Sequence, residues 1–159
     1  MYLFLIVALV VGFDQVTKYL VSTLMDSGQS IPIINNWLYL TYVRNPGAAF
    51  GMLPYRTVFL IVVTVLVAVF IVYYYRTLPP GYRLLRVALA LQLGGAVGNL
   101  IDRVRNAYVV DFIDVSFFPP VFNVADSAIV IGIGLFLIAF WRMSIMIPEI
   151  KTDKTAKIS

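Results

Sequence analysis

The chain has 159 residues, of which 61% are hydrophobic and 13% are charged, and its mean hydropathy is +0.91. Soluble domains are roughly half apolar and about one-quarter charged, so this composition excludes a soluble fold and allows about four membrane spans of ~20 residues. The net charge is +4, and the basic residues are scattered and form no nucleic-acid patch. The chain contains neither cysteine nor histidine. This excludes a disulfide, a thiol nucleophile, a Ser-His-Asp triad and a histidine- or cysteine-ligated metal.

The first apolar segment covers about residues 1–24. A secretory signal peptide would begin with a basic region and end at a small-residue cleavage site. This segment has no basic start, and it contains Asp14, Gln15 and Lys18. We therefore expect a retained span whose polar side chains face protein rather than lipid.

The next segment, residues 25–56, is polar and rich in turn residues such as Asn45-Pro46-Gly47. Between the turns lies Trp37–Val43, which is rich in aromatic and β-favouring residues. Trp and Tyr prefer the membrane–water interface. This pattern predicts short strands that lie at the bilayer surface.

Three further apolar segments complete the chain, at residues 57–75, 84–101 and about 121–146. The loop at residues 104–120 contains a β-like stretch, Tyr108–Ile113, and residues 147–159 form a solvated tail with three lysines. The predicted fold is a single integral membrane domain over residues 1–159, mainly α-helical with a small β component.

Four spans place both termini on one side of the membrane. Seven basic residues belong to that side and four to the other. The first group is Arg76, Arg83, Arg86, Arg142, Lys151, Lys154 and Lys157, and the second is Arg44, Arg56, Arg103 and Arg105. The positive-inside rule makes the first side cytoplasmic, so the loops 25–56 and 104–120 face outward.

Ionisable side chains within spans are costly and usually functional. Asp14 and Lys18 are four residues apart and share a helix face. A purely structural interpretation of the two residues is an ion pair that stabilises the helix. Asp102 and Arg103, at the outer end of the third span, are equally explained as an interfacial anchor.

The fourth span begins with a second polar group. Asn123 and Asp126 lie three residues apart in its first turn, and Asn123 suits a helix N-cap. Asp111 lies in the preceding outer loop, where a solvated surface role is equally expected, and Asp114 competes with it. The topology allows these residues to gather near the outer leaflet. Gly94 and Gly98 form a GxxxG pair that allows close helix packing.

Three functions fit such a cluster. The first is hydrolysis by a pair of aspartates. Because two adjacent carboxylates cannot both ionise cheaply, one keeps a proton while the other activates water. A second hydrolytic option is a dyad of Lys18 and Ser22, although Asp14 would keep that lysine charged. A non-enzymatic option is a small proton- or ion-coupled carrier, but no inverted repeat is visible and the charges lie at one edge.

Five segments in order make the whole chain resemble the bacterial lipoprotein signal peptidases (signal peptidase II). These segments are Asp14–Lys18, Asn45–Gly51, Gly94–Arg103, Val109–Phe112 and Phe122–Ser127. The resemblance implies an aspartyl endopeptidase that cleaves signal peptides from diacylglyceryl-modified prolipoproteins. It also implies four transmembrane helices with an outer-face β-cradle, to which Asn45–Gly51 belongs and which closes over the substrate with a nearby helical segment.

The resemblance further implies which residues act. The catalytic pair falls on Asp111 and Asp126, which favours Asp111 over Asp114 and Asp102. The supporting residues fall on Asp14, Lys18, Asn45, Gly47, Asn99, Arg103 and Asn123. We expect no metal or cofactor, a monomer surrounded by lipid, and a site near the outer face of the bacterial cytoplasmic membrane.

Overall fold

The computed structural model describes the backbone of residues 2–47 and 56–156, and the side chains of residues 3–47 and 56–144. Within the expected turn at Asn45–Gly51, residues 48–51 lie outside this description.

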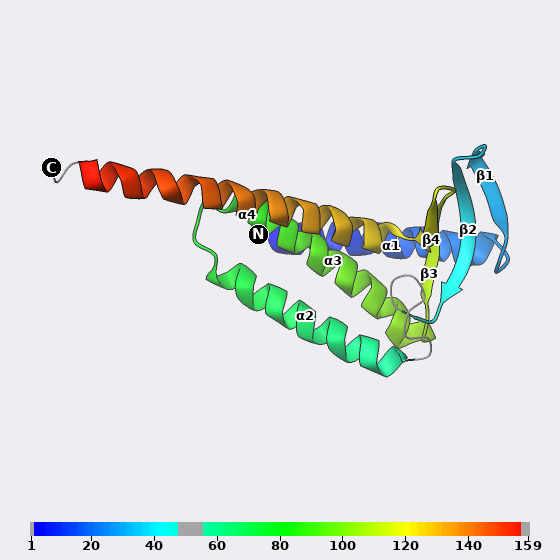
Figure 1. Cartoon of the computed structure of the whole chain (residues 1–159). Helices are drawn as coiled ribbons and strands as arrows, with labels where there is room; N and C mark the ends of the chain where they lie inside the picture. The colour runs from blue at the N-terminus through cyan, green and yellow to red at the C-terminus, as the bar shows by residue number, and fades with distance from the viewer. Residues whose placement is uncertain (1, 48–55, 157–159) are drawn as a thin grey trace.

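Four long helices form the body of the molecule (Figure 1). They are α1 (Tyr2–Leu24), α2 (Thr57–Thr77), α3 (Arg83–Asn106) and α4 (Val124–Ala156). Each contains at least 21 residues that are apolar enough to cross a bilayer. The central helix is α3, since it packs against α1, α2 and α4 and more than half of its span is buried. The four predicted spans are therefore confirmed.

A four-stranded antiparallel sheet covers one end of the helices (Figure 1). Its strands are β1 (Ser30–Ile34), β2 (Leu38–Asn45), β3 (Val109–Val115) and β4 (Phe118–Phe122), paired in chain order. The two predicted β-like stretches correspond to β2 and β3. Their pairing brings the outer loops, which lie far apart in the sequence, to the end of the helices where α1 and α3 end and α4 begins.

Three boundaries differ from the sequence-based expectation. The helix α3 continues to Asn106, because Asp102 is buried among partners and basic residues in a last helical turn are favourable. Residues 118–122 form the edge strand β4, which takes in the end of the expected loop and the first two residues of the expected fourth span. Its Pro119-Pro120 pair is tolerated because an edge strand pairs on one side only. The helix α4 continues to Ala156, through most of the expected tail.

Glycines on α3 let the neighbouring helices approach closely. A methyl group on Gly94 would lie 2.8 Å from Val10 Cβ of α1, and one on Gly98 would lie 2.6 Å from Asp14 Oδ2. One on Gly95 would overlap the carbonyl oxygen of Ala125 in α4. Close packing by the GxxxG pair is confirmed, and Gly95 extends it to α4.

Replacement of Gly95 by alanine is therefore expected to destabilise the fold. Overpacking at such a contact typically costs about 1–3 kcal/mol, which outweighs the helix propensity of alanine, worth at most ~1 kcal/mol. Thermal unfolding in detergent would measure the effect. Gly134→Ala is the matched control, because nothing lies within 4 Å of a methyl group there. Equal stability of the two variants would contradict the packing argument.

Candidate active site

Asn123 connects the two aspartates singled out by the sequence. Its side-chain Nδ2 donates a hydrogen bond of 2.6 Å to Asp111 Oδ1, and its backbone N–H donates one of 3.2 Å to Asp126 Oδ2. Asp111 comes from the middle of β3 and Asp126 from the first turn of α4. One fully buried residue thus holds both carboxyl groups at a single place between sheet and helices.

A reciprocal capping arrangement fixes Asp126 at the start of α4. The Oδ1 atom of Asn123 accepts a 2.9 Å hydrogen bond from the backbone N–H of Asp126, while the Asp126 carboxylate accepts from the backbone N–H of Asn123. This is the capping-box pattern, with aspartate in the position usually held by glutamate or glutamine. The predicted N-cap role of Asn123 is confirmed.

Asn99 of α3 and Lys18 of α1 support the aspartate pair from the side of the helices. Asn99 Nδ2 donates to Asp126 Oδ1 at 2.7 Å, and Asn99 Oδ1 accepts from Lys18 Nζ at 2.9 Å. The remaining partners of Lys18 are Asp14 Oδ2 at 2.8 Å and Asp102 Oδ2 at 3.0 Å. Three acceptors match the three donors of an ammonium group, so this buried lysine is fully paired in its charged form.

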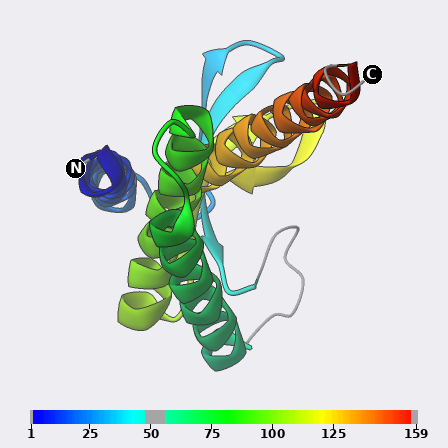
Figure 2. The same cartoon turned by 90° about the vertical axis from the view of Figure 1, so that its left-hand side faces the viewer.

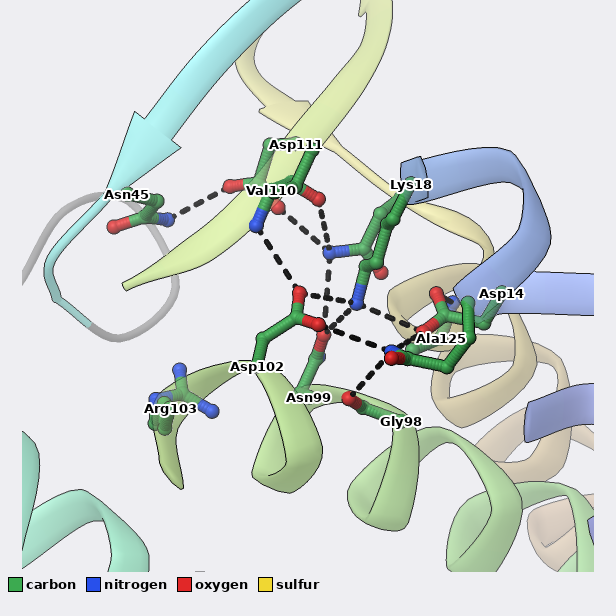
Figure 3. A network of polar contacts seen from close by, with 12 residues as sticks. Asp14, Lys18, Asn45, Gly98, Asn99, Asp102, Arg103, Val110, Asp111 and Ala125 are labelled. Carbon is green, nitrogen blue, oxygen red and sulfur yellow. Dashed lines mark hydrogen bonds and ion pairs between the residues drawn. The ribbon is translucent and has the colours of Figure 1, made fainter. Parts of the chain in front are cut away.

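The two acidic partners of Lys18 each hold the start of an element that carries a catalytic candidate (Figure 3). Asp14 Oδ1 accepts a 2.9 Å hydrogen bond from the backbone N–H of Ala125, at the beginning of α4. Asp102 Oδ2 accepts a 3.2 Å bond from the backbone N–H of Val110, next to Asp111. The ion cluster therefore fixes the position of β3 relative to α4.

The last residue of β2, Asn45, contacts the other side of Asp111 (Figure 3). Asn45 Nδ2 donates to Asp111 Oδ2 at 2.9 Å, while Asn45 Oδ1 accepts from the backbone N–H of Gly47 at 2.9 Å. Arg103 Nη2 donates to the carbonyl oxygen of Gly47 at 3.1 Å. Every supporting residue expected from the sequence thus belongs to one connected network.

Two residues of this network were not singled out. The sequence alone indicates Asp102 only as an anchor or a competitor of Asp111, and Gln15 only as a polar residue of the first span. Gln15 Nε2 lies within 3.2 Å of Asp14 Oδ2, Asp102 Oδ1 and the carbonyl oxygen of Gly98. The available signal was spacing, because Asp102 lies three residues after Asn99 on the same face of α3.

The competing residues lie elsewhere. Asp114 is on β3 but accepts a 2.7 Å hydrogen bond from Thr41 Oγ1 of β2, outside the network. Ser22 is exposed, and its hydroxyl donates to the carbonyl oxygen of Tyr19, whereas Lys18 points into the protein. With the lysine donors occupied, Lys18 and Ser22 do not form a nucleophilic dyad.

Burial sets the ionisation of Asp111. The residue is 2% exposed, and this desolvation raises the pKa of its carboxyl group from the ordinary 3.8 to about 7. The hydrogen bond from Asn45 opposes the rise, and the negative charge of Asp126 adds to it. Near neutral pH, Asp111 is therefore able to hold a proton while remaining hydrogen-bonded. Two linked carboxyl groups of which one is protonated can perform general acid and general base chemistry on the same water.

The chain is similar to known proteins in both sequence and structure. The model of the family described as signal peptidase (SPase) II matches residues 6–142. The lipoprotein signal peptidase of Moorella thermoacetica is 51% identical over 139 residues, covering 87% of this chain and 90% of that protein. The lipoprotein signal peptidase of Pelotomaculum thermopropionicum is 46% identical over 157 residues, covering 99% of this chain and 97% of the relative. A bacterial membrane enzyme solved by the in meso method at 2.3 Å resolution superposes with a TM-score of 0.84 at 39% identity, covering 90% of this chain and 89% of its own.

Proposed function

Because the chain belongs to the signal peptidase II family, whose members remove signal peptides from prolipoproteins, we propose that Asp111 and Asp126 are its catalytic aspartates. The observation that carries this assignment is the pair of hydrogen bonds from Asn123 to both carboxyl groups. No third carboxylate of the described residues receives a hydrogen bond from Asn123. Asp102 is occupied by Lys18, Gln15 and Val110, and Asp114 bonds to Thr41.

Asp111 is the acid and Asp126 the base in this proposal. Burial raises the pKa of Asp111 to about 7, so this carboxyl group keeps its proton up to about that pH. Asp126 lies in the first turn of α4 and accepts a backbone N–H there, where the helix dipole favours a negative charge. The pair still titrates as a unit, so the assignment describes the dominant state of the pair below about pH 7.

The reaction then needs only water and the two carboxyl groups. Asp126 takes a proton from water, and the oxygen attacks the scissile carbonyl carbon while Asp111 gives its proton to the carbonyl oxygen. The resulting tetrahedral diol collapses when the C–N bond breaks. The proton held by Asp126 passes to the leaving amine, and one diol hydroxyl returns its proton to Asp111. Both products leave, and the pair has its starting charge.

Cleavage should accordingly decline at alkaline pH. The proton on Asp111 is present below its pKa of about 7 and is lost as pH rises through that value, so kcat/KM should fall about tenfold per pH unit above it. Purified protein in detergent, assayed between about pH 5 and 9, would measure this. Asp114→Asn should show the same profile, because Asp114 lies outside the network. A flat profile up to pH 9 would contradict the role given to Asp111.

The proposal also covers the lipid group of the substrate and the route by which the substrate reaches the site. We infer that the prolipoprotein carries a diacylglyceryl group on the cysteine after the scissile bond, as the family resemblance implies, and that it reaches the site laterally from the bilayer. The site lies at the end of the helices covered by the sheet (Figure 1), where water can reach the scissile bond. The excess of basic residues at the opposite ends of the helices supports a site near the outer face, with both termini in the cytoplasm. The protein acts as a monomer in this account.

A further inference from the structure

A groove lies between the spans of α2, α3 and α4. It has a volume of about 280 Å³, and its walls include Phe70, Tyr74, Leu89, Ile133 and Phe136. Figure 2 shows α2 and α4 diverging, with α4 running toward the upper right of the view and the start of α2 lying toward the bottom. The helix α3 contributes Leu89 and Gln92 to the groove, whose lining is apolar except for the Gln92 amide and the Tyr74 hydroxyl group.

Gln92 is unusual for its location. Its Nε2 atom is buried and has no hydrogen-bond partner among the described residues. An amide left unpaired in an apolar environment costs roughly 1–3 kcal/mol, and native structures contain few such groups. The first carbons of the side chain are held against α4, since a methyl group on Gly132 would lie 2.7 Å from Gln92 Cγ. The amide nitrogen thus lies beside the groove without an acceptor of its own among the described residues.

The register of both helices connects Gln92 with the catalytic residues. Gln92 precedes Asn99 by seven residues on α3, and Ile133 follows Asp126 by seven residues on α4. Seven residues are two helical turns, so each pair shares a helix face and is separated by about 10 Å along the axis. A segment that leaves the active site along these faces reaches the groove two turns deeper.

We propose that this groove holds the hydrophobic segment of the signal peptide and that Gln92 selects substrates with a hydrogen-bond acceptor there. The inference rests on the proposed catalytic function of Asp111 and Asp126. Its ligand is an apolar peptide with one hydroxyl-bearing residue, Ser or Thr, whose oxygen accepts from Gln92 Nε2. The distance of about 10 Å corresponds to roughly three residues of extended chain or seven of helix before the scissile bond.

A substrate series tests this directly. The hydrophobic segment of a prolipoprotein is made of Leu and Ala only, and a single Ser is then moved through the third to eighth positions before the scissile bond. We expect one position to lower KM of the unmodified protein about three- to tenfold, as interhelical hydrogen bonds in membranes do. In Gln92→Leu this preference should vanish, while the Leu-Ala substrate is cleaved with unchanged kcat.

The control is Thr64→Val, which removes a different intramembrane polar group whose hydroxyl already donates to the carbonyl oxygen of Leu60. It should keep the Ser preference. The inference is overturned if no Ser position lowers KM, or if Gln92→Leu cleaves all substrates equally poorly, since that would indicate a structural role. Failure of the unmodified protein to cleave any substrate would overturn the proposed function, and this inference with it.

Discussion

Asp111→Asn and Asp126→Asn are each expected to slow cleavage of a prolipoprotein by about 10²–10⁴-fold, the usual contribution of positioned acid–base groups. Asparagine keeps the shape of aspartate and one carbonyl oxygen that accepts hydrogen bonds. It can neither take a proton from water nor give one to the scissile carbonyl. The rate should therefore fall while the fold is retained, which purified protein in detergent would show by separate rate and unfolding measurements.

Asp114→Asn is the matched control for this experiment. Asp114 lies on the same strand, three residues after Asp111, but its carboxylate accepts from Thr41 of β2. We expect it to retain most of the activity. If Asp114→Asn alone abolished cleavage, the acid would have to be reassigned to that residue.

Lys18→Met is expected to have the largest effect on stability. Lys18 is 3% exposed and pairs with Asp14 and Asp102, which are also buried. Removing one member of a buried ion cluster leaves uncompensated charge and typically costs about 3–5 kcal/mol. Because Asp14 and Asp102 hold the starts of α4 and β3, activity should fall as well. Denaturant or thermal unfolding in detergent would measure the loss.

A second substitution distinguishes this explanation from simple loss of packing. Asp14→Asn removes one of the two negative charges that Lys18→Met leaves unpaired. It keeps an oxygen that can accept a hydrogen bond from the backbone N–H of Ala125. The double variant Lys18→Met/Asp14→Asn should therefore be more stable than Lys18→Met alone. Additive destabilisation would show that the charge of Lys18 is not what matters.

Much of the fold was predictable because lipid imposes a strong constraint on composition. Uninterrupted apolar runs revealed the four helices, and aromatic, β-branched stretches revealed β2 and β3. The edge strand β4 was missed because Phe118–Phe122 is apolar and adjoins a span. The end of α3 was placed too early because Asp102 and Arg103 resemble loop residues when their partners are unknown.

The site residues were predictable for two different reasons. Polar residues within spans are rare, so Asp14, Lys18 and Asn99 stood out from composition. The choice of Asp111 over Asp114 depended on the family resemblance, because sequence spacing does not reveal strand register. In the structure Asp111 pairs with Val43 and Asp114 with Tyr39, with a register shift between these positions on β2. Only the folded sheet brings one of the two carboxyl groups to Asn123. The carrier hypothesis is set aside, because the family is one of peptidases.

The central claim is that Asp111 and Asp126 act on one water as a unit, and a comparison of single and double variants tests it most directly. The rate of cleavage of a diacylglyceryl-modified prolipoprotein is measured for Asp111→Asn, Asp126→Asn and the double variant, all purified and folded. Residues that act together are strongly non-additive, so we predict that the double variant is about as slow as either single one. Multiplication of the two single losses, or a single variant that cleaves at the unmodified rate, would contradict the account.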